Sequence, residues 1–394
     1  MKVEAGGTRY TKLVELYHLT YEAFEDARIK KRLPVHDLDL RRFALNAASV
    51  VGLDYFKASK SWITKFKKTY NIVSRKVTKF VTTKSMKNLE ITKAAAAKFI
   101  DENKALVQRD PKNCINGDQS GFQKELRFGR VLDALGTKMI DVIAQSAYAL
   151  THSSTIMPFI TAAGQLLEPV LVVLQEKDGK FTDRVEDKLI VPKNLVVCAS
   201  KSGKMEKRHV EIALTQTVFP HCSTTEVTNL FLDSWSGHTD LKFLEGLTRG
   251  TGVKIDVKKL PPGTTDETQP LDKFGFRPGK VYFRKIVEYI ILKEIPFVLS
   301  KRQNIIFVLA FFVRQLSSPR YNNLWKYSWH ACGYTEDHPG PFVTPAQFAF
   351  DHDCRVCESP SCRNEAMLRC SWCRSVLCFD HLFTNLPLCD KYVP

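Results

Sequence analysis

The sequence has no apolar segment long enough to cross a membrane. Its longest uninterrupted apolar run is nine residues, at positions 305–313, whereas a transmembrane helix needs about 20. The first ten residues, MKVEAGGTRY, are charged from the outset and hold no apolar stretch ahead of a small-residue cleavage site. We therefore expect no secretion signal and no membrane partner.

Acidic residues are scarce in the first third of the chain. Residues 55–89 contain ten Lys and Arg residues but no Asp or Glu. The whole chain of 394 residues has a net charge of +16, of which +12 lies in residues 1–115. A basic region of this kind favours a polyanionic partner. The 44% apolar content excludes a mainly disordered chain, and the length predicts two or three domains.

Cysteine is nearly absent before residue 330, and eight of the eleven cysteines lie between Cys332 and Cys389. A secreted disulfide protein is not expected to concentrate its cysteines in one tail. Close CxxC pairs in an intracellular chain favour metal binding instead. The candidate zinc ligands are Cys354, Cys357, Cys362, Cys370, Cys373, Cys378, His381 and Cys389.

Eight ligands are enough for two tetrahedral zinc ions, and a domain of this size needs metal to fold. An interleaved arrangement would place Cys354, Cys357, Cys373 and Cys378 at one ion, and the other four ligands at the second. The spacing does not establish this division, and Cys332, His338 or His352 could replace a member. A RING-like ubiquitin ligase is disfavoured because the tail is short.

The basic head shows three helical segments. Apolar residues recur at helical spacing over residues 10–31, and a second helix is expected over residues 37–51, ending at Gly52. Ser59 is a good N-cap for a third helix that runs to about Tyr70. Three helices of this kind predict an all-α helix-turn-helix domain.

The third helix has one apolar and one basic face. Trp62, Ile63, Phe66 and Tyr70 fall within about 100° of a helical wheel, and polar residues cover the rest. A helix that enters a DNA groove needs such a division, although a Lys-rich face can also be merely solvated. The candidate DNA-binding residues are Lys60, Ser61, Lys65, Lys67, Lys68, Arg75, Lys76 and Lys79.

The middle of the chain mixes strands and helices and carries three notable aspartates. Asp118 and Asp233 each follow a short apolar strand, and Asp272 precedes a helix expected over residues 273–293. Further strands are expected at residues 153–161 and 169–174, and a helix near residues 209–218. A sheet that gathers carboxylates at its edge could hold two Mg²⁺ or Mn²⁺ ions about 4 Å apart, which cleave phosphodiesters.

These blocks resemble a known family. The segments DQSGF at 118–122, LDSWSGH at 232–238 and LPPGTT at 260–265, followed by QPLD at 269–272, resemble the mariner/pogo superfamily of DDE transposases. The segment FKASKSWITKFKK at 56–68 resembles the helix-turn-helix of its centromere-protein-B/jerky/Tigger branch. The resemblance covers roughly residues 10–290.

The resemblance implies an RNase-H-like core, a mixed sheet flanked by helices, with Asp118, Asp233 and Asp272 as its metal-binding triad. It also implies hydrolysis of DNA ends and strand transfer to target DNA. Glu267, in the loop that leads to Asp272, is an alternative to Asp272 as the third ligand. The chain departs from the family at Ser234, in a longer gap between the second and third acids, and in having room for a single helix-turn-helix.

The predicted organisation has five parts. Residues 1–84 form the helix-turn-helix domain, 85–108 a linker helix, 109–300 the endonuclease core, 301–350 a helical extension and linker, and 351–394 the zinc-binding domain. The apolar stretch within residues 292–319 is expected to pack onto the core. The segment SKSGK at 200–204 lacks the features of a phosphate loop, so no nucleotide cofactor is expected.

The leading hypothesis is therefore a nuclear, Mg²⁺-dependent transposase-derived protein that binds double-stranded DNA. Terminal inverted repeats are the expected DNA targets, and a homodimer is a candidate assembly. Two alternatives stay open: a non-catalytic DNA-binding or chromatin protein, and a zinc-dependent adaptor for protein interactions.

Overall fold

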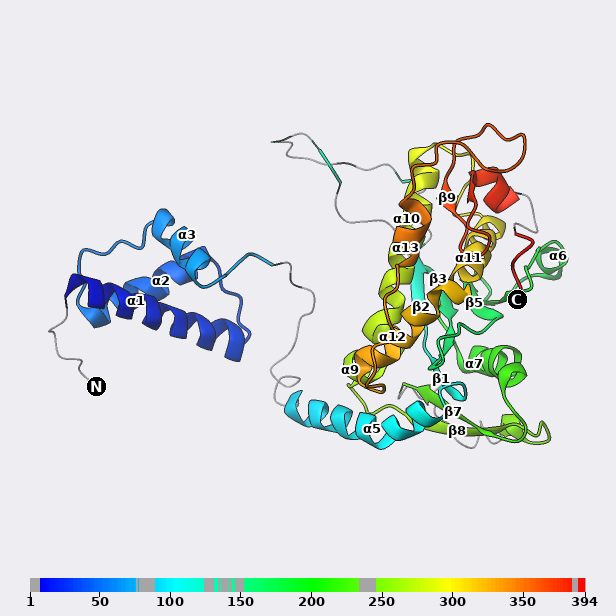
Figure 1. Cartoon of the computed structure of the whole chain (residues 1–394), viewed down its shortest axis with the longest axis horizontal. Coiled ribbons are helices and arrows are strands. Elements are labelled where there is room, and N and C mark those ends of the chain that lie inside the picture. Colours follow the sequence, from blue (N-terminus) through cyan, green and yellow to red (C-terminus); the bar gives the residue numbers. More distant parts are fainter. Residues whose placement is uncertain are drawn as a thin grey trace. The chain divides into compact units, whose positions relative to one another are not determined.

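The structure is a computed structural model that describes residues 8–75, 77, 89–123, 131–133, 135, 141, 144–145, 152–233, 246–384 and 389–393. It divides into two compact units, Met1–Thr83 and Lys84–Pro394 (Figure 1). Within the described ranges, no helix is both long and apolar enough to span a membrane.

The first unit is built from three helices, as predicted. They are α1 (Arg9–Phe24), which continues into the π-helical turn η1 (Glu25–Lys30), α2 (Asp37–Val51) and α3 (Lys60–Thr69). Gly52 ends α2 with a left-handed φ of 69°, which suits a residue without a side chain. The hydroxyl oxygen of Ser59 accepts a hydrogen bond from the backbone N–H of Trp62 at 3.3 Å and caps α3.

The second unit contains two four-stranded sheets that share one hairpin. Their strand orders are β4-β1-β7-β8 and β2-β3-β5-β6. Ile115 pairs with Thr161 in one sheet and Ser120 with Ile156 in the other, so a single antiparallel register continues through the break at Asp118. β1 and β2 therefore form one interrupted strand, and β3 and β4 form its antiparallel partner.

This sheet is mixed, because β7 and β8 run parallel to β1, and β6 runs parallel to β5. The strands are β1 (Cys114–Gly117), β2 (Ser120–Gln123), β3 (His152–Met157), β4 (Phe159–Thr161), β5 (Val170–Gln175), β6 (Leu195–Ser200), β7 (Val227–Leu232) and β8 (Lys254–Lys259). The strands expected at residues 153–161 and 169–174 are confirmed.

Both faces of the sheet are buried under helices. In β5, Val170, Val172 and Leu174 contact one hydrophobic cluster, whereas Leu171 and Val173 contact another. The first cluster includes α10 and α11, and the second includes α7, so these helices lie on opposite sides of the sheet (Figure 1). A strand that is buried on both faces has to be apolar throughout, and the sequence VLVVL of β5 meets this requirement.

Helices and short turns complete the second unit. They are α5 (Leu89–Arg109), α6 (Asp183–Glu186), α7 (Lys207–Ala213), η2 (Leu214–Val218), η3 (Phe219–His221), α9 (Thr265–Thr268), η4 (Leu271–Gly275), α10 (Phe276–Leu292), α11 (Arg302–Leu316), η5 (Pro319–Tyr321), α12 (Asn322–Cys332) and α13 (Pro345–Phe350). The helices expected at residues 209–218 and 273–293 are confirmed, and α11 is buried against the core as expected. The predicted mixed sheet flanked by helices and the helical N-terminal domain are confirmed, and this arrangement fits an RNase-H-like core.

The cysteine-rich tail packs against α11. It contains β9 (Leu368–Arg369), β10 (Val376–Leu377) and the turn η6 (Asp380–Thr384). The rings of Phe311 and Phe383 lie 4.5 Å apart, and the indole N–H of Trp372 donates to the backbone oxygen of Arg314 at 2.7 Å. The tail therefore shares its hydrophobic core with α11 rather than having a separate one.

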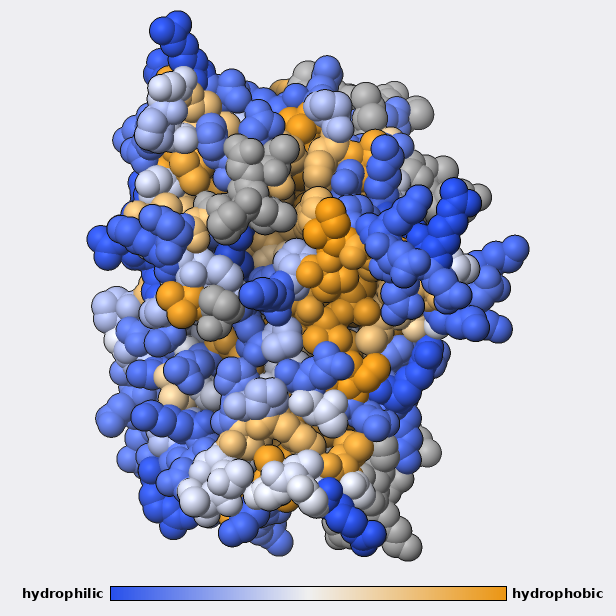
Figure 2. Space-filling model, turned by 90° about the vertical axis from the view of Figure 1, so that its right-hand side faces the viewer, coloured by the Kyte–Doolittle hydropathy of each residue, from blue (hydrophilic) through white to orange (hydrophobic). Residues whose placement is uncertain are grey.

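The surface of the molecule is not uniformly polar. Figure 2 shows an apolar strip bordered by hydrophilic residues on one side of the molecule. Strand β6 forms an edge of the sheet, and its Val196, Val197 and Cys198 are half-buried.

Candidate metal and nucleic-acid sites

Helix α3 presents the predicted basic face. Ile63 and Phe66 are buried between the helices, whereas Lys60, Lys65 and Lys68 are exposed. The ring of Trp62 lies 5.0 Å from that of Phe56, which fixes the apolar face against the loop before the helix. The two faces predicted from the helical wheel are therefore present.

The remaining candidate DNA-binding residues are placed differently. Lys67 is half-buried, and its ammonium lies 2.7 and 2.8 Å from the two carboxylate oxygens of Asp37. This ion pair joins α3 to the start of α2, so Lys67 has a structural partner that the sequence reading did not foresee. Ser61 and Arg75 are exposed, whereas Lys76 and Lys79 lie outside the described residues.

The structure brings the three predicted aspartates to one place in the second unit. Asp118 lies at the break between β1 and β2, Asp233 directly follows β7, and Asp272 lies in η4. The side chains of Asp118 and Asp272 are joined by a hydrogen bond, and the charge of Asp233 acts on both. Strands β1 and β7 are parallel neighbours, so their carboxyl ends meet at the same edge of the sheet.

It is electrostatically unfavourable for all three aspartates of this cluster to be ionised at the same time. Asp118 is only 5% exposed. Burial, and after it the charge of Asp272, raise the pKa of Asp118 well above its ordinary value, although the backbone N–H of Gln119 opposes the shift. The pKa of Asp272, which lies at the exposed rim, is raised by desolvation and by the charge of Asp266. A bound cation would relieve this repulsion.

Asn116 connects the three segments that carry the aspartates. Its side-chain N–H donates to the backbone oxygen of Phe231 in β7 at 3.0 Å, and its side-chain oxygen accepts from the backbone N–H of Leu271 at 3.2 Å. The Gln269 side chain adds a second link, donating to the backbone oxygen of Gly117 at 3.1 Å. Asn116 was not among the predicted site residues, although it lies two positions before Asp118.

Replacing Asn116 with Ala is expected to lower the free energy of unfolding by about 2–4 kcal/mol. The change leaves the backbone oxygen of Phe231 and the N–H of Leu271 buried without their partner. Asn229→Ala in β7 is the control, because the Asn229 side chain donates only one local hydrogen bond of 3.4 Å within the described chain, to the backbone oxygen of Val227 in the same strand. Equal losses for the two variants in urea unfolding would contradict the role given to Asn116.

The rival third acid, Glu267, has a different partner. Its carboxylate lies 2.6 Å from the ammonium of Lys273, at the surface of α9. The structure thus places Asp272, rather than Glu267, in hydrogen-bonding contact with Asp118. Ser234 and His238, which belong to the second motif, lie outside the described residues.

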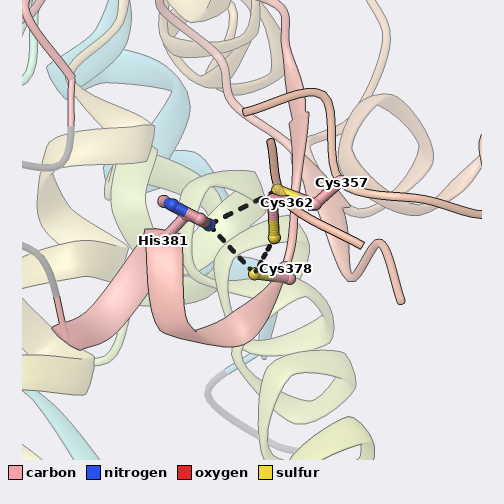
Figure 3. Close-up of side chains that lie close together, drawn as sticks. All are labelled: Cys357, Cys362, Cys378 and His381. Atoms are coloured by element: carbon pink, nitrogen blue, oxygen red, sulfur yellow. Dashed lines mark hydrogen bonds between the residues drawn. The ribbon is translucent and has the colours of Figure 1, made fainter. Parts of the chain in front are cut away.

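The tail cysteines form two clusters. Cys357, Cys362, Cys378 and His381 form the first (Figure 3), and Cys370, Cys373 and Cys389 form the second. The ligand atoms within each cluster lie within 4.8 Å of one another. This grouping differs from the interleaved arrangement predicted from the sequence. Cys354 is in neither cluster, and its thiol donates to the backbone oxygen of Val356 at 3.0 Å.

The β9–β10 hairpin explains the difference. Cys370 follows β9 and Cys378 follows β10, so the antiparallel pairing places them at opposite ends of the hairpin. The backbone N–H of Glu358 donates a hydrogen bond to the backbone oxygen of Val376 at 2.9 Å, and this bond holds the loop after Cys357 beside β10. Each cluster therefore forms at one end of the hairpin, and the substitutes Cys332, His338 and His352 belong to neither cluster in the described chain.

The first cluster has the dimensions of a zinc site. A tetrahedron with ordinary zinc–ligand bonds has edges of about 3.8 Å between sulfurs and about 3.5 Å between sulfur and nitrogen. The thiols of Cys362 and Cys378 lie 3.9 Å apart, and Nδ1 of His381 lies 3.5 Å from Cys357 and 3.2 Å from Cys378. No cysteine in the described chain forms a disulfide. Three thiols and one imidazole thus fit a tetrahedral ion.

Two known sequence families match the ends of the chain. The family described as the Tc5 transposase DNA-binding domain matches residues 18–76, which include α2 and α3. The family described as the Tc5 transposase C-terminal domain matches residues 329–389, which include both cysteine clusters. In both of these regions the chain is similar to Tc5 transposases. The predicted resemblance to a transposase is thereby confirmed, whereas the centromere-protein-B/jerky/Tigger branch stays a prediction.

Solved structures of the Mos1 transposase resemble the chain only remotely. The Mos1 transposase paired-end complex with left transposon end is 10% identical, covers 86% of this chain and 83% of its own, and has a TM-score of 0.38. The Mos1 Strand Transfer Complex is also 10% identical; the match covers 84% of this chain and 81% of that chain, with a TM-score of 0.41. The Mos1 mariner paired end complex with Mn is 9% identical; the match covers 87% of this chain and 83% of that chain, with a TM-score of 0.41. No curated protein matches the chain.

Proposed function

We propose that this transposase relative cleaves and joins DNA through a pair of divalent cations held by Asp118, Asp233 and Asp272. The observation that carries the proposal is the convergence of three carboxyl groups from three separate elements on one edge of the sheet. Buried acids that repel one another are costly to keep, and they commonly mark a functional site.

The donor set suits Mg²⁺ or Mn²⁺, because hard cations prefer carboxylate oxygens and water as ligands. When bound, such a pair supplies an activated attacking oxygen and stabilises the leaving oxygen of a phosphodiester. Asp118, Asp233 and Asp272 would hold the two ions. No protein side chain has to transfer a proton in this scheme.

The fold contributes rigidity to this site. Asp118 is held in the strand break by the backbone N–H of Gln119, and Asn116 fixes the segment that carries Asp272. Short aspartate arms on a buried sheet keep the carboxylates in place before a cation arrives. Asn116 therefore acts as a positioning residue for the acidic cluster.

The proposed function is tested by incubating the purified full chain with Mg²⁺ or Mn²⁺ and DNA that carries candidate end repeats. Cleavage that requires the divalent ion is the expected result. Binding of the same DNA without cleavage in either ion would contradict the nuclease and would correspond to the non-catalytic DNA-binding alternative.

The helical head is proposed to bind double-stranded DNA through α3. Its exposed cations lie opposite a buried apolar face, and the Tc5 DNA-binding family matches this region. DNA association of this kind is consistent with a nuclear protein. Terminal inverted repeats as the target, and a homodimer that pairs two ends, are further parts of the proposal.

Replacing Lys60, Lys65 and Lys68 together with Ala is expected to flatten the salt dependence of DNA affinity. Each lost phosphate contact lowers the slope of log K against log salt by about 0.9, so three contacts lower it by about 2.7. Lys30→Ala in η1 is the control, since it removes one exposed charge from another element. An unchanged slope in fluorescence anisotropy titrations of the triple variant would place the DNA surface elsewhere.

The tail is proposed to bind zinc as a structural metal. The first cluster supplies four ligands, and the second supplies Cys370, Cys373 and Cys389. Ser371, between two of these ligands, donates its N–H to the side chain of Gln315 in α11 at 2.7 Å. A metal ion bound by these cysteines would stabilise the packing of the tail against α11. Metal analysis of the purified chain should find about two zinc ions.

A further inference from the structure

One lysine of α10 lies beside the acidic cluster. Lys280 is half-buried, and its ammonium lies 5.7 Å from the ring centre of Phe276 and 5.9 Å from that of Phe122. Phe276 is one helical turn earlier on the same face of α10, and Phe122 is in β2, four residues after Asp118. Lys280 is thus held between α10 and β2, the elements that follow Asp272 and Asp118 in the sequence.

The side chain of Lys280 spans an apolar and a charged environment. Together with Phe122, Phe276 and Phe312 it lines an apolar cavity of about 30 Å³. Its ammonium interacts electrostatically with the carboxyl groups of Asp272 and Asp118. Within the described chain, no carboxylate lies within 4.0 Å of this ammonium, so an oxygen of another molecule can still approach it. A long side chain that buries its stem and presents its charge is stable in this position.

We propose that Lys280 binds the scissile phosphodiester of the DNA substrate. This inference rests on the proposed function, because it assigns the ammonium to the substrate of the same acidic site. Negative charge builds up on the phosphoryl group in the transition state. Two divalent cations that are already partly neutralised by three acids leave some of this charge unbalanced. A fixed cation beside the reacting phosphate provides this stabilisation without any reorganisation of solvent.

Neighbouring lysines of the same region are arranged differently. Lys273 is next to Asp272 in sequence, but its ammonium is paired with Glu267 at 2.6 Å. Lys285 is exposed, and its ammonium lies 5.5 Å from the ring centre of Phe350 in α13. Lys285 is five positions after Lys280, about 140° around the helix, so it faces another direction. Lys280, by contrast, interacts electrostatically with both Asp272 and Asp118.

The test compares Lys280→Gln, Lys280→Arg and the control Lys285→Gln in the full chain, on the duplex that the wild-type protein binds most tightly. Lys280→Gln is expected to lower the single-turnover rate of cleavage with Mn²⁺ by about 10²–10³-fold. With Ca²⁺ in place of Mn²⁺, it should also lower the slope of log K against log salt by about 0.9, because one phosphate contact is lost. Lys280→Arg should keep the slope and part of the rate, and Lys285→Gln should keep the rate.

Three results would overturn the inference. The first is a wild-type rate and slope for Lys280→Gln, and the second is a loss no larger than that of Lys285→Gln. The third is a slower rate with an unchanged salt slope and tighter Mn²⁺ binding, which would make Lys280 only a counter-charge for the acids. If the wild-type protein cleaves no DNA, the proposed function fails, and the salt slope still decides whether Lys280 contacts a phosphate.

Discussion

Asp118→Asn is expected to abolish divalent-ion-dependent cleavage of DNA. Asp118 is the most enclosed acid of the cluster and interacts with both others, so its carboxylate is the one on which a pair of cations most depends. Removing several kcal/mol of charge stabilisation corresponds to a loss of about 10³-fold or more. The measurement is the rate of strand cleavage with Mn²⁺ at saturating DNA.

The same substitution should not unfold the protein. The pKa of Asp118 is raised in the folded state, so the folded chain binds more protons than the unfolded chain above the ordinary pKa of an aspartate. Without divalent ions, stability is therefore expected to fall as pH rises through this window. Asp118→Asn removes that effect and should be more stable than the wild type near neutral pH in EDTA.

This pair of results separates chemistry from folding. A variant that is stable, binds DNA and does not cleave supports the metal site. Cleavage that survives Asp118→Asn would show that the triad assignment is wrong. Asp266→Asn serves as a control, because the charge of Asp266 raises the pKa of Asp272, whereas the pKa of Asp118 is raised by burial and by the charges of Asp272 and Asp233.

Removal of zinc is expected to destabilise the whole second unit, not the tail alone. The tail residues Phe383 and Trp372 pack on α11, and α11 is part of the core that covers the sheet. Structural zinc contributes on the order of 10 kcal/mol to small domains, so losing a ligand should lower the melting temperature by about 10 °C or more. Thermal unfolding of Cys378→Ser, followed with zinc analysis, measures this effect.

Cys354→Ser is the matched control for this prediction. It makes the same chemical change at a cysteine of the same tail that lies outside both clusters. We expect its zinc content and melting temperature to be close to those of the wild type. A loss for Cys354→Ser equal to that for Cys378→Ser would contradict the clusters, and a chain purified without any zinc would exclude them.

Local patterns explain why much of the fold could be predicted from the sequence. The end of the second helix and the start of the third were predicted correctly, because Gly52 and Ser59 act through their own backbone and side-chain geometry. The apolar run of β5 and the helical spacing of α10 are equally local signals. The acids were found through the motifs around them, and the structure brings them together.

Partners that depend on tertiary structure could not be predicted. The Lys67–Asp37 ion pair joins residues 30 positions apart. The link between Asn116 and Leu271 spans 155 positions. Seven of the eight predicted zinc ligands lie in the two clusters, but their division depends on the direction of the β9–β10 hairpin, which spacing does not show. Cys354 matched the pattern and still lies outside both clusters.

The most direct test of the account is a crystal of the full chain with DNA, soaked in Mn²⁺ and measured at the manganese absorption edge. We predict two anomalous peaks about 4 Å apart, within bonding distance of carboxylate oxygens of Asp118, Asp233 and Asp272. Manganese bound elsewhere, or the three carboxylates directed to different sides of the molecule, would contradict the proposed nuclease.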